Sequence, residues 1–376
     1  MSKKIKKLLI ANRGEIAIRI ARAGNELGIR TIGIYSDEDK YSLHRFKMDE
    51  TYLIGKDKDP VEAYLSMDEI IELALRKGVD AIHPGYGFLA ENAEFAEKCR
   101  ENHIIFIGPE PETLRLFEDK LKSKEVAERC NVPVIPGSEK ALKDVDEAVS
   151  FAEEFGYPVM LKASKGGGGR GLRIIRNKRE LLDNFESAKR EAEKAFGNSD
   201  VFIEKRIEKP KHIEVQILAD KYGNVVHLYE RDCSIQRRHQ KMMEMAPARN
   251  IPEGVLQNLY RDAIKMAKAS NYVNAGTFEF LMDEDFNYYF LETNPRIQVE
   301  HTVTERITGI DIVHCQIYIA EGERLDGEKL NLKQENIKRR GYALQCRITT
   351  EDPENNFMPD TGVLEAYRSP AGFGIR

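Results

Sequence analysis

The run Gly166–Gly169 is the part of this chain whose residue type and spacing point most directly to chemistry. Glycine has no Cβ, so its backbone can approach a ligand closely, but four in a row lose much conformational entropy on folding. A polyphosphate held by successive backbone N–H groups would offset that loss. A flexible linker is the alternative, and the regular-looking flanks YPVMLKAS and LRIIRN disfavour it. We interpret the run as a phosphate-binding loop, although it matches neither the Walker pattern nor GxGxxG.

Two carboxylates form a second candidate group. The segments AGTFEFLM and YYFLETN predict a β-hairpin with its turn near Asp285, so Glu279 falls almost opposite Glu292. Cross-strand neighbours lie about 5 Å apart, where two carboxylates repel each other unless a cation lies between them. Mg²⁺ binds one or two carboxylates together with phosphate oxygens. A solvated hairpin face is the alternative, but apolar neighbours such as Phe278 and Phe290 favour a metal site.

The segment after this hairpin, NPRIQVEH, is dense in polar groups. If it is extended, its alternate residues point to one face, and these are Asn294, Arg296, Gln298 and Glu300. Two amides, a guanidinium and a carboxylate on one face would suit a small planar anion and a base. Any one of the four could instead be a strand-edge or loop residue, but their alignment beside the carboxylate pair favours a site.

A basic run, CSIQRRHQK, places Arg237, Arg238, His239 and Lys241 together in an acidic chain. Such a run is often a solvated face. Here it lies between two apolar stretches, which favours an anion site at the end of a strand. Cys233 is interpreted as a packed small residue rather than a nucleophile.

The elements that would position these groups fall into three stretches. In the first ~110 residues, short apolar strands alternate with helical patterns, which predicts a parallel sheet covered by helices. A smaller α+β unit follows and carries the glycine run at its tip, as a mobile lid would. From His212 onward the pattern is strongly β, with two hairpins and two late strands, YALQCRIT and GVLEAYR. The predicted helices are Glu15–Leu27, Leu65–Lys77, Leu116–Cys130, Asp144–Phe155, Asn177–Phe196 and Glu253–Ala269.

Composition excludes several classes of function. The 376 residues are 41% hydrophobic and 32% charged with a net charge of −5, which gives no general attraction to nucleic acid or to an acidic membrane. Five cysteines without a CxxC pair indicate neither a zinc site nor a disulfide framework, and reduced thiols fit the cytoplasm. Neither a signal peptide nor an apolar run long enough to span a bilayer is expected.

Seven motifs in order resemble the biotin carboxylase branch of the ATP-grasp enzymes. The resemblance extends from Ile5 to Arg376, and its motifs are ANRGEIA, HPGYGFL, KASKGGGGRG, EKRIEKPKHIEVQIL, ERDCSIQRRHQK, NPRIQVEHTVTE and QCRITTEDP. It implies an α/β and α+β fold in three parts. These are a Rossmann-like N-terminal domain at 1–113, an ATP-grasp region at 114–340 with a glycine-loop lid at about 134–204, and the incomplete start of a C-terminal subdomain at 341–376.

The resemblance also implies a ligase reaction. ATP with Mg²⁺ (or Mn²⁺) would phosphorylate bicarbonate to carboxyphosphate, and the carboxyl group would pass to biotin. Details such as HRFKMDETYLIG are most similar to pyruvate carboxylases, where this is the first half-reaction. The alternatives are the biotin carboxylase subunit of an acetyl-CoA or propionyl-CoA carboxylase, an ATP-grasp ligase forming amides or carbamoyl phosphate, and a truncated, inactive ATP-binding fragment.

Carried over by position, the resemblance assigns roles to residues. Contacts to ATP fall on Lys120, Lys162, Gly166, Gly167, Gly168, Gly169, Glu204, Lys205, His212, Gln236 and His239. Glu279, Glu292 and Asn294 would hold the metal, and Lys241, Arg296, Gln298 and the Val299 backbone would hold bicarbonate. Glu300 would be the general base, and Arg296 with Arg347 would stabilise the biotin enolate.

The implied partners are a biotin carboxyl carrier domain, since this sequence has no Met-Lys-Met carrier motif, and a carboxyltransferase domain. The full-length enzyme would be a homo-oligomer, and neither nucleic acid nor a membrane is an expected partner. One departure from the family pattern is Glu118, where the family usually has glycine, and it bears on the placement of Lys120.

Overall fold

The computed structural model describes residues 4–138, 140–163, 172–196, 199–238, 240–360 and 362–376. The predicted phosphate loop, Gly166–Gly169, and His239 lie outside the described residues. The chain divides into two compact units, residues 1–345 and residues 346–376. None of the described helices combines the length and the apolar character needed to cross a membrane.

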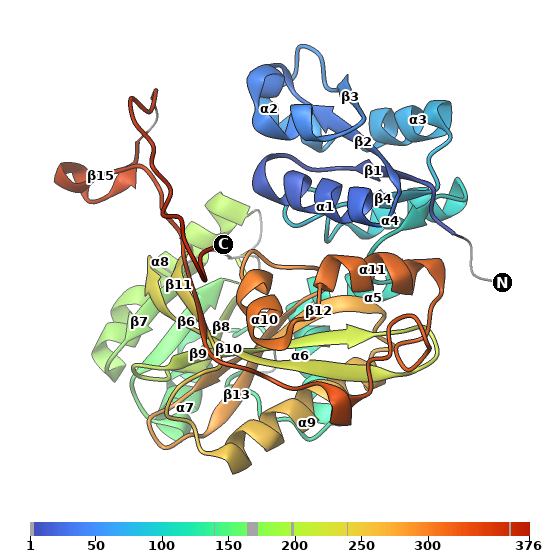
Figure 1. Ribbon diagram of the computed structural model, residues 1–376. Helices are drawn as coiled ribbons and strands as arrows, with labels where there is room; N and C mark the ends of the chain where they lie inside the picture. Colours follow the sequence, from blue (N-terminus) through green and yellow to red (C-terminus); the bar gives the residue numbers. More distant parts are fainter. Residues whose placement is uncertain (1–3, 139, 164–171, 197–198, 239, 361) are drawn as a thin grey trace. The chain divides into compact units, whose positions relative to one another are not determined.

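A parallel five-stranded sheet opens the first unit, with its strands in the order β3-β2-β1-β4-β5 (Figure 1). Its elements are β1 (Lys7–Ile10), α1 (Gly14–Glu26), β2 (Arg30–Tyr35), η1 (Asp37–Tyr41), η2 (Leu43–Lys47), β3 (Glu50–Leu53), α2 (Pro60–Tyr64), α3 (Met67–Lys77), β4 (Ala81–His83), α4 (Ala93–Glu101) and β5 (Ile105–Phe106). Both faces of β1 are buried, because Leu8 packs with α1 while Leu9 packs with α3 and α4. The predicted alternation is confirmed, although β3, α2 and α4 were not predicted and α3 starts at Met67 rather than Leu65.

Among the described residues, four helices and a small antiparallel sheet follow. They are α5 (Pro111–Glu118), α6 (Lys120–Arg129), α7 (Val145–Phe155), β6 (Val159–Ala163), β7 (Leu172–Ile175), α8 (Lys178–Phe196) and β8 (Val201–Lys205). The strands have the order β7-β6-β8, and α7 and α8 bury Val149 and Phe185 against them.

The predicted single helix Leu116–Cys130 is wrong. Asp119 adopts extended angles (φ −86°, ψ 108°) between α5 and α6, and its side chain accepts hydrogen bonds from the backbone N–H groups of Leu121 and Lys122. A carboxylate that caps the start of a helix in this way separates two helices that share one apolar pattern. Glu118 is the last residue of α5, so its helical backbone does not require the glycine that the family usually has there.

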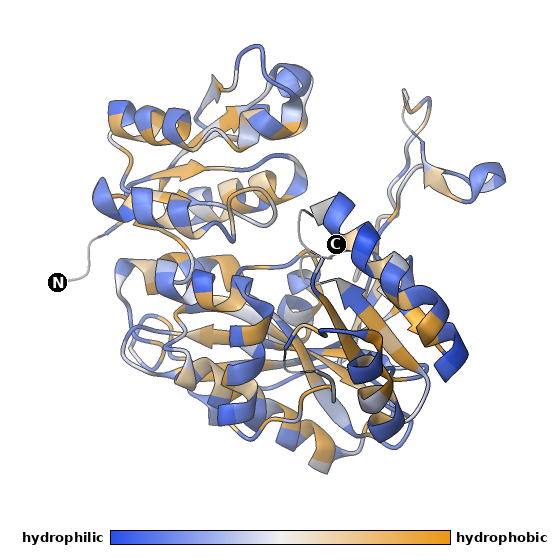
Figure 2. Ribbon diagram, turned by 180° about the vertical axis from the view of Figure 1, so that it is seen from behind, coloured by the Kyte–Doolittle hydropathy of each residue, from blue (hydrophilic) through white to orange (hydrophobic). Residues whose placement is uncertain are grey.

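A six-stranded sheet in the order β13-β12-β9-β10-β11-β14 completes the first unit (Figure 1). Its elements are β9 (Lys211–Ala219), β10 (Val225–Arg237), β11 (Gln240–Ala246), α9 (Glu253–Ala269), β12 (Asn274–Met282), β13 (Tyr288–Asn294), α10 (His301–Thr308), α11 (Ile312–Glu321), η3 (Gln334–Asn336) and β14 (Ala343–Cys346). Both predicted hairpins are confirmed as antiparallel pairs, β9 with β10 and β12 with β13. One face packs Val215 and Phe278 against Met266 of α9, and the strands are largely hydrophobic where the helices carry hydrophilic stripes (Figure 2).

The second unit contains β15 (Glu351–Asp352), η4 (Pro353–Asn355) and β16 (Met358–Pro359), and the two strands pair with each other. The strand predicted at GVLEAYR is wrong. Its apolar side chains Val363, Leu364 and Tyr367 are 93%, 62% and 76% exposed, and no described strand pairs with this segment. A strand pattern needs a neighbouring strand to satisfy its backbone hydrogen bonds.

Candidate active site

Charged side chains form a row across the six-stranded sheet, on the face opposite α9. Glu292 of β13 pairs in register with Glu279 of β12, Glu279 with Glu214 of β9, and Glu214 with Arg231 of β10. The predicted opposition of Glu279 and Glu292 is therefore confirmed. A β-bulge in β13 makes it possible, because Phe280 pairs with Phe290 and the next pair already joins Glu279 to Glu292.

Lys241 of β11 is the centre of this group. Its Nζ atom lies 2.6 Å from a carboxylate oxygen of Glu214, 3.0 Å from one of Glu279 and 2.7 Å from one of Glu300. Burial alone would lower the pKa of Lys241, but the three surrounding carboxylates raise it far above its usual value. Burial likewise acts to raise the pKa of Glu279, yet Lys241 and His212 hold it well below the usual range. The site therefore keeps both Lys241 and Glu279 charged.

A second, completely buried cation lies beside this group. Arg231 has no exposed side-chain surface, and its guanidinium donates to five side-chain oxygens, those of Glu214 (2.5 Å), Gln216 (2.7 Å), Gln298 (2.8 Å), Thr277 (3.0 Å) and Thr304 (3.1 Å). All five N–H donors of an arginine can be satisfied in this way. Burial acts to lower the pKa of Arg231, and the Glu214 charge outweighs it and raises the pKa. Arg231 thus ties β9, β10 and β12 to the loop that carries Gln298.

His212 connects the same cluster to Gln236. Its Nε2 atom lies 2.5 Å from Glu279, and its Nδ1 atom lies 3.1 Å from the side-chain amide of Gln236. Burial would lower the pKa of His212, but the Glu279 carboxylate raises it above its usual value. This is expected where Lys241 and Arg231 face three carboxylates, since a third positive charge balances them.

The segment after β13 is not extended, which corrects one expectation. The strand ends at Asn294, and the chain bends at Arg296 and turns at Val299 and Glu300 before α10 begins at His301. Three of the four predicted residues still converge on the cluster. Asn294 and Gln298 donate to the same Glu279 oxygen at 2.7 and 2.8 Å, and Glu300 contacts Lys241.

Arg296 diverges from that group and turns toward the N-terminal sheet. Its Nε atom pairs with Glu91, while its terminal nitrogens donate to the backbone oxygen of Ile297 (3.2 Å) and to the side-chain oxygen of Asn294 (3.0 Å). The Asn294 oxygen that was expected on a metal therefore faces Arg296. The role of Val299 through its backbone stays a prediction.

Glu292 has the surroundings that suit a bound dication. Part of the Glu292 surface is exposed, but neighbouring protein atoms remove much of the water around its carboxylate. This desolvation and the Glu279 charge raise the pKa of Glu292, while the positive charge of Lys120 acts to lower it. Repulsion across the hairpin was expected to need a metal. Lys241 and His212 already hold the pKa of Glu279 low, so the repulsion that still raises a pKa is at Glu292, and a cation there would relieve it.

Three residues predicted to contact ATP from the lid do not lie together, because Lys162 and Glu204 contact each other and Lys205 points elsewhere. Lys162 of β6 forms an ion pair with Glu204 of β8, on neighbouring antiparallel strands. Lys205 points elsewhere, because its Nζ atom donates to the backbone oxygens of Phe155 (2.6 Å) and Gly156 (3.1 Å) at the end of α7. Its side chain is therefore not beside Lys162 and Glu204, as successive residues of a strand face opposite sides.

Arg237 ends β10 and Arg238 lies in the turn to β11, so the basic run is at the tip of a hairpin. Arg347 belongs to the second unit, and its role stays a prediction. Cys233 is buried, and burial raises its pKa well above the usual value, which agrees with a packed thiol.

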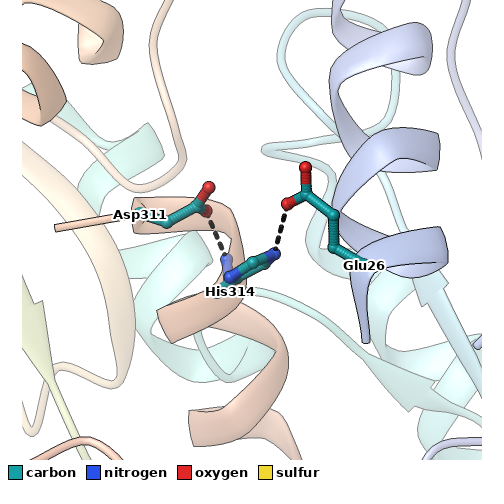
Figure 3. A group of neighbouring side chains, drawn as sticks. All are labelled: Glu26, Asp311 and His314. Atoms are coloured by element: carbon teal, nitrogen blue, oxygen red, sulfur yellow. Dashed lines mark hydrogen bonds and ion pairs between the residues drawn. The ribbon is translucent and has the colours of Figure 1, made fainter. Parts of the chain in front are cut away.

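Another acid–histidine group lies away from this cluster, between α1 and α11 (Figure 3). Asp311 caps α11 by accepting from the backbone N–H of His314 at 2.8 Å, and the His314 ring lies 3.0 Å from Glu26. Arg19 lies 2.6 Å from Asp311 and neutralises it. These contacts account for the group as a junction between two helices.

Two family models match the chain. The N-terminal domain of biotin carboxylase matches residues 4–114, and the ATP-binding domain of the carbamoyl-phosphate synthase L chain matches residues 119–328. The biotin carboxylase domain of Hydrogenobacter thermophilus 2-oxoglutarate carboxylase is 53% identical, with a TM-score of 0.92 over 100% of this chain and 81% of that chain. The chain belongs to the biotin carboxylase family. The predicted resemblance and the ATP-grasp fold class are confirmed.

Other members of the biotin carboxylase family are similarly close. Pyruvate carboxylase of Staphylococcus aureus (strain Mu50) is 56% identical over 375 residues, which are 100% of this chain and 32% of that protein. Biotin carboxylase of Campylobacter jejuni, solved in complex with β,γ-ATP, is 47% identical with a TM-score of 0.90, over 98% of this chain and 81% of that chain. The chain spans about a third of the length of the curated relatives it matches.

Sequence reasoning missed Glu214, Arg231 and Glu91. The signal for Glu214 was present, because Glu214 and Gln216 alternate with Ile213, Val215 and Ile217 in β9. Polar residues at every second position between apolar ones indicate a polar face, and a partner such as Arg231 on the next strand is then required if that face is buried.

Proposed function

We propose that this chain catalyses the ATP- and Mg²⁺-dependent carboxylation of biotin with bicarbonate, through carboxyphosphate. The observation that carries the proposal is Lys241, which holds Glu300 and Glu279 together in one buried cluster. A metal-binding acid, a cation for an anionic substrate and a base are thereby within one hydrogen-bonded group. The H. thermophilus relative was solved with MgADP, ADP and bicarbonate, which supports the same ligands for this chain.

The residues act mainly by placement. Glu300 would accept the proton of bicarbonate, and its contact with Lys241 at 2.7 Å fixes where its carboxylate lies. Lys241 and Arg296 would neutralise bicarbonate while phosphate is transferred. Phosphoryl transfer depends on positioning and charge neutralisation more than on covalent catalysis by the protein.

Glu279 and Glu292 would hold Mg²⁺, which would neutralise the ATP phosphates. The donor set fits, since Mg²⁺ accepts one or two carboxylates with phosphate oxygens and water. Lys162, Glu204, His212 and Gln236 are proposed nucleotide contacts, as are Lys120, Lys205, His239 and Gly166–Gly169. The domain boundaries at 113 and 340, the Arg347 role and a cytoplasmic location also remain proposals.

The carboxyl acceptor beyond biotin is proposed to be pyruvate, with biotin delivered by a carrier domain and used by a carboxyltransferase domain in an oligomer. The relatives named pyruvate carboxylase support this choice. The H. thermophilus relative carboxylates 2-oxoglutarate by its name, which makes that acid an alternative acceptor. Acetyl-CoA and propionyl-CoA carboxylases share the same first step.

One assay tests the proposal. ATP cleavage by this chain is measured with and without bicarbonate and with free biotin added. We expect bicarbonate-dependent cleavage that biotin increases. ATP cleavage at a rate that does not change with free biotin would favour a ligase forming amides or carbamoyl phosphate. Nucleotide binding without cleavage would favour an inert binding module.

Lys162→Ala should raise the KM for ATP about tenfold with a smaller change in kcat, because a lysine beside phosphates contributes ground-state and transition-state binding alike. Steady-state kinetics at saturating bicarbonate measures this. Lys178→Ala is the matched control, since Lys178 lies in the same lid-like part with an exposed ion pair to Glu153. An unchanged KM for Lys162→Ala would place the lysine outside the nucleotide site.

Glu292→Gln should weaken Mg²⁺ dependence. Removal of one of two carboxylate ligands is expected to raise the Mg²⁺ concentration for half-maximal activity by about ten- to a hundredfold, at fixed nucleotide. Glu284→Gln, an exposed position in the turn of the same hairpin, serves as the control. A variant with the same Mg²⁺ curve as the parent would show that Glu292 does not bind the metal.

A further inference from the structure

The N-terminal sheet fixes the start of the loop that follows β4. Asn12, which follows β1, donates from its amide to the backbone oxygens of Pro84 (2.7 Å) and Tyr86 (2.8 Å). His83, at the end of β4, accepts from the Gly85 backbone N–H at 3.1 Å. Gly85 has φ +66°, and a Cβ there would lie 2.9 Å from the Asn12 amide nitrogen, so only glycine fits. The loop that leads to Glu91 is therefore fixed at its start by two buried side chains.

Two ion pairs join this N-terminal part to the segment that carries the bicarbonate residues. Glu91 pairs with the Nε atom of Arg296, which lies on the bend directly after β13. Arg19 of α1 lies 3.0 Å from Glu305 of α10, and both side chains are only 6% exposed. The bend and the helix that follows it are thus each joined to the N-terminal part by one ion pair.

The contacts of Arg296 define the plane of its guanidinium. Glu91, Asn294 and the Ile297 backbone take one N–H each, on three different nitrogens. An arginine has five N–H donors, so the described contacts leave one on each terminal nitrogen. Two such donors in one plane are the fork that binds a planar carboxylate or bicarbonate.

We propose that Glu91 is a positioning residue for the anion-binding Arg296, so that the N-terminal domain sets the orientation of the bicarbonate fork. This rests on the proposed function. An acceptor on Nε prevents the guanidinium from rotating and fixes where its two terminal nitrogens lie, one of them against the Asn294 side chain. Glu91 itself is 44% exposed, so its effect should be moderate.

Glu91→Ala tests this in bicarbonate-dependent ATP cleavage, with Glu91→Gln as the conservative variant that keeps an acceptor oxygen. We expect the KM for bicarbonate to rise about fivefold for alanine and less for glutamine, with the KM for ATP changed less than about twofold. The control is Glu94→Ala, a 67% exposed acid nearby whose partner is Lys98.

An unchanged KM for bicarbonate, or equal increases in both KM values, would overturn the proposal, the latter because general loosening affects both substrates. A lower KM for bicarbonate would also overturn it, since Glu91 would then compete with the anion for Arg296. Failure of the proposed function looks different, because the unsubstituted chain would then show no bicarbonate-dependent cleavage at all.

Discussion

Glu300→Gln is expected to reduce bicarbonate-dependent ATP cleavage by about 10²- to 10⁴-fold, the range that a positioned proton acceptor contributes. The glutamine oxygen can still accept from Lys241, so the contact at 2.7 Å has a replacement and the buried cluster keeps its shape. What the amide cannot do is take a proton. Nucleotide affinity should therefore remain within about twofold of the parent chain, measured by calorimetric titration with ATP analogue and Mg²⁺.

Two further variants make this result specific to proton transfer. Glu300→Asp keeps a carboxylate on a shorter side chain and should recover part of the lost rate, whereas the exposed Glu193→Gln should behave like the parent. If Glu300→Gln lost nucleotide affinity and turnover to the same extent, Glu300 would be a structural member of the cluster and a different group would be the base.

The β12–β13 hairpin is the clearest case in which the sequence alone predicted the pairing of two strands. Alternation in β12 and β13 and the turn residues between them predicted the pairing of Glu279 with Glu292, and the structure has it. The bulge next to Phe280 was not predictable from alternation, because a regular register would have placed Leu291 opposite Glu279. The regular part of the ladder is centred on Asp285, as predicted, which by itself leaves Glu292 one residue away from the position opposite Glu279, and the bulge brings the two carboxylates into register.

The site around the hairpin was less predictable, and the reason is physical. Lys241 approaches Glu279 and Glu300 from β11, which two other strands separate from the strand of Glu279, and only the strand order shows that it does. The polar residues after Asn294 were expected on one face of an extended strand, yet they meet because the chain bends at Arg296 and turns at Glu300. A local period describes one element, whereas these contacts depend on how separate elements pack.

Arg231→Met is expected to lower the free energy of unfolding by about 3–5 kcal/mol, which is the usual cost of removing one partner of a buried ion pair. Methionine is of similar length but leaves Glu214 without its 2.5 Å partner, and it leaves the Gln298 side-chain oxygen without the donor that now holds it. Lys241 cannot compensate fully, because it already faces Glu279 and Glu300 as well. Denaturant unfolding of the purified chain, followed by circular dichroism, measures the change.

A double variant separates the effect of the unpaired Glu214 charge from the effect of lost packing. Glu214→Gln combined with Arg231→Met removes the uncompensated charge, so the double variant should be less destabilised than the sum of the two single variants, by about 0.5–3 kcal/mol. Arg324→Met is the surface control, since Arg324 is 48% exposed and pairs with Asp326, and it should cost less than about 1 kcal/mol. Strict additivity in the double variant would mean that Arg231 acts through packing, and the buried charge balance would then not explain why the site holds together.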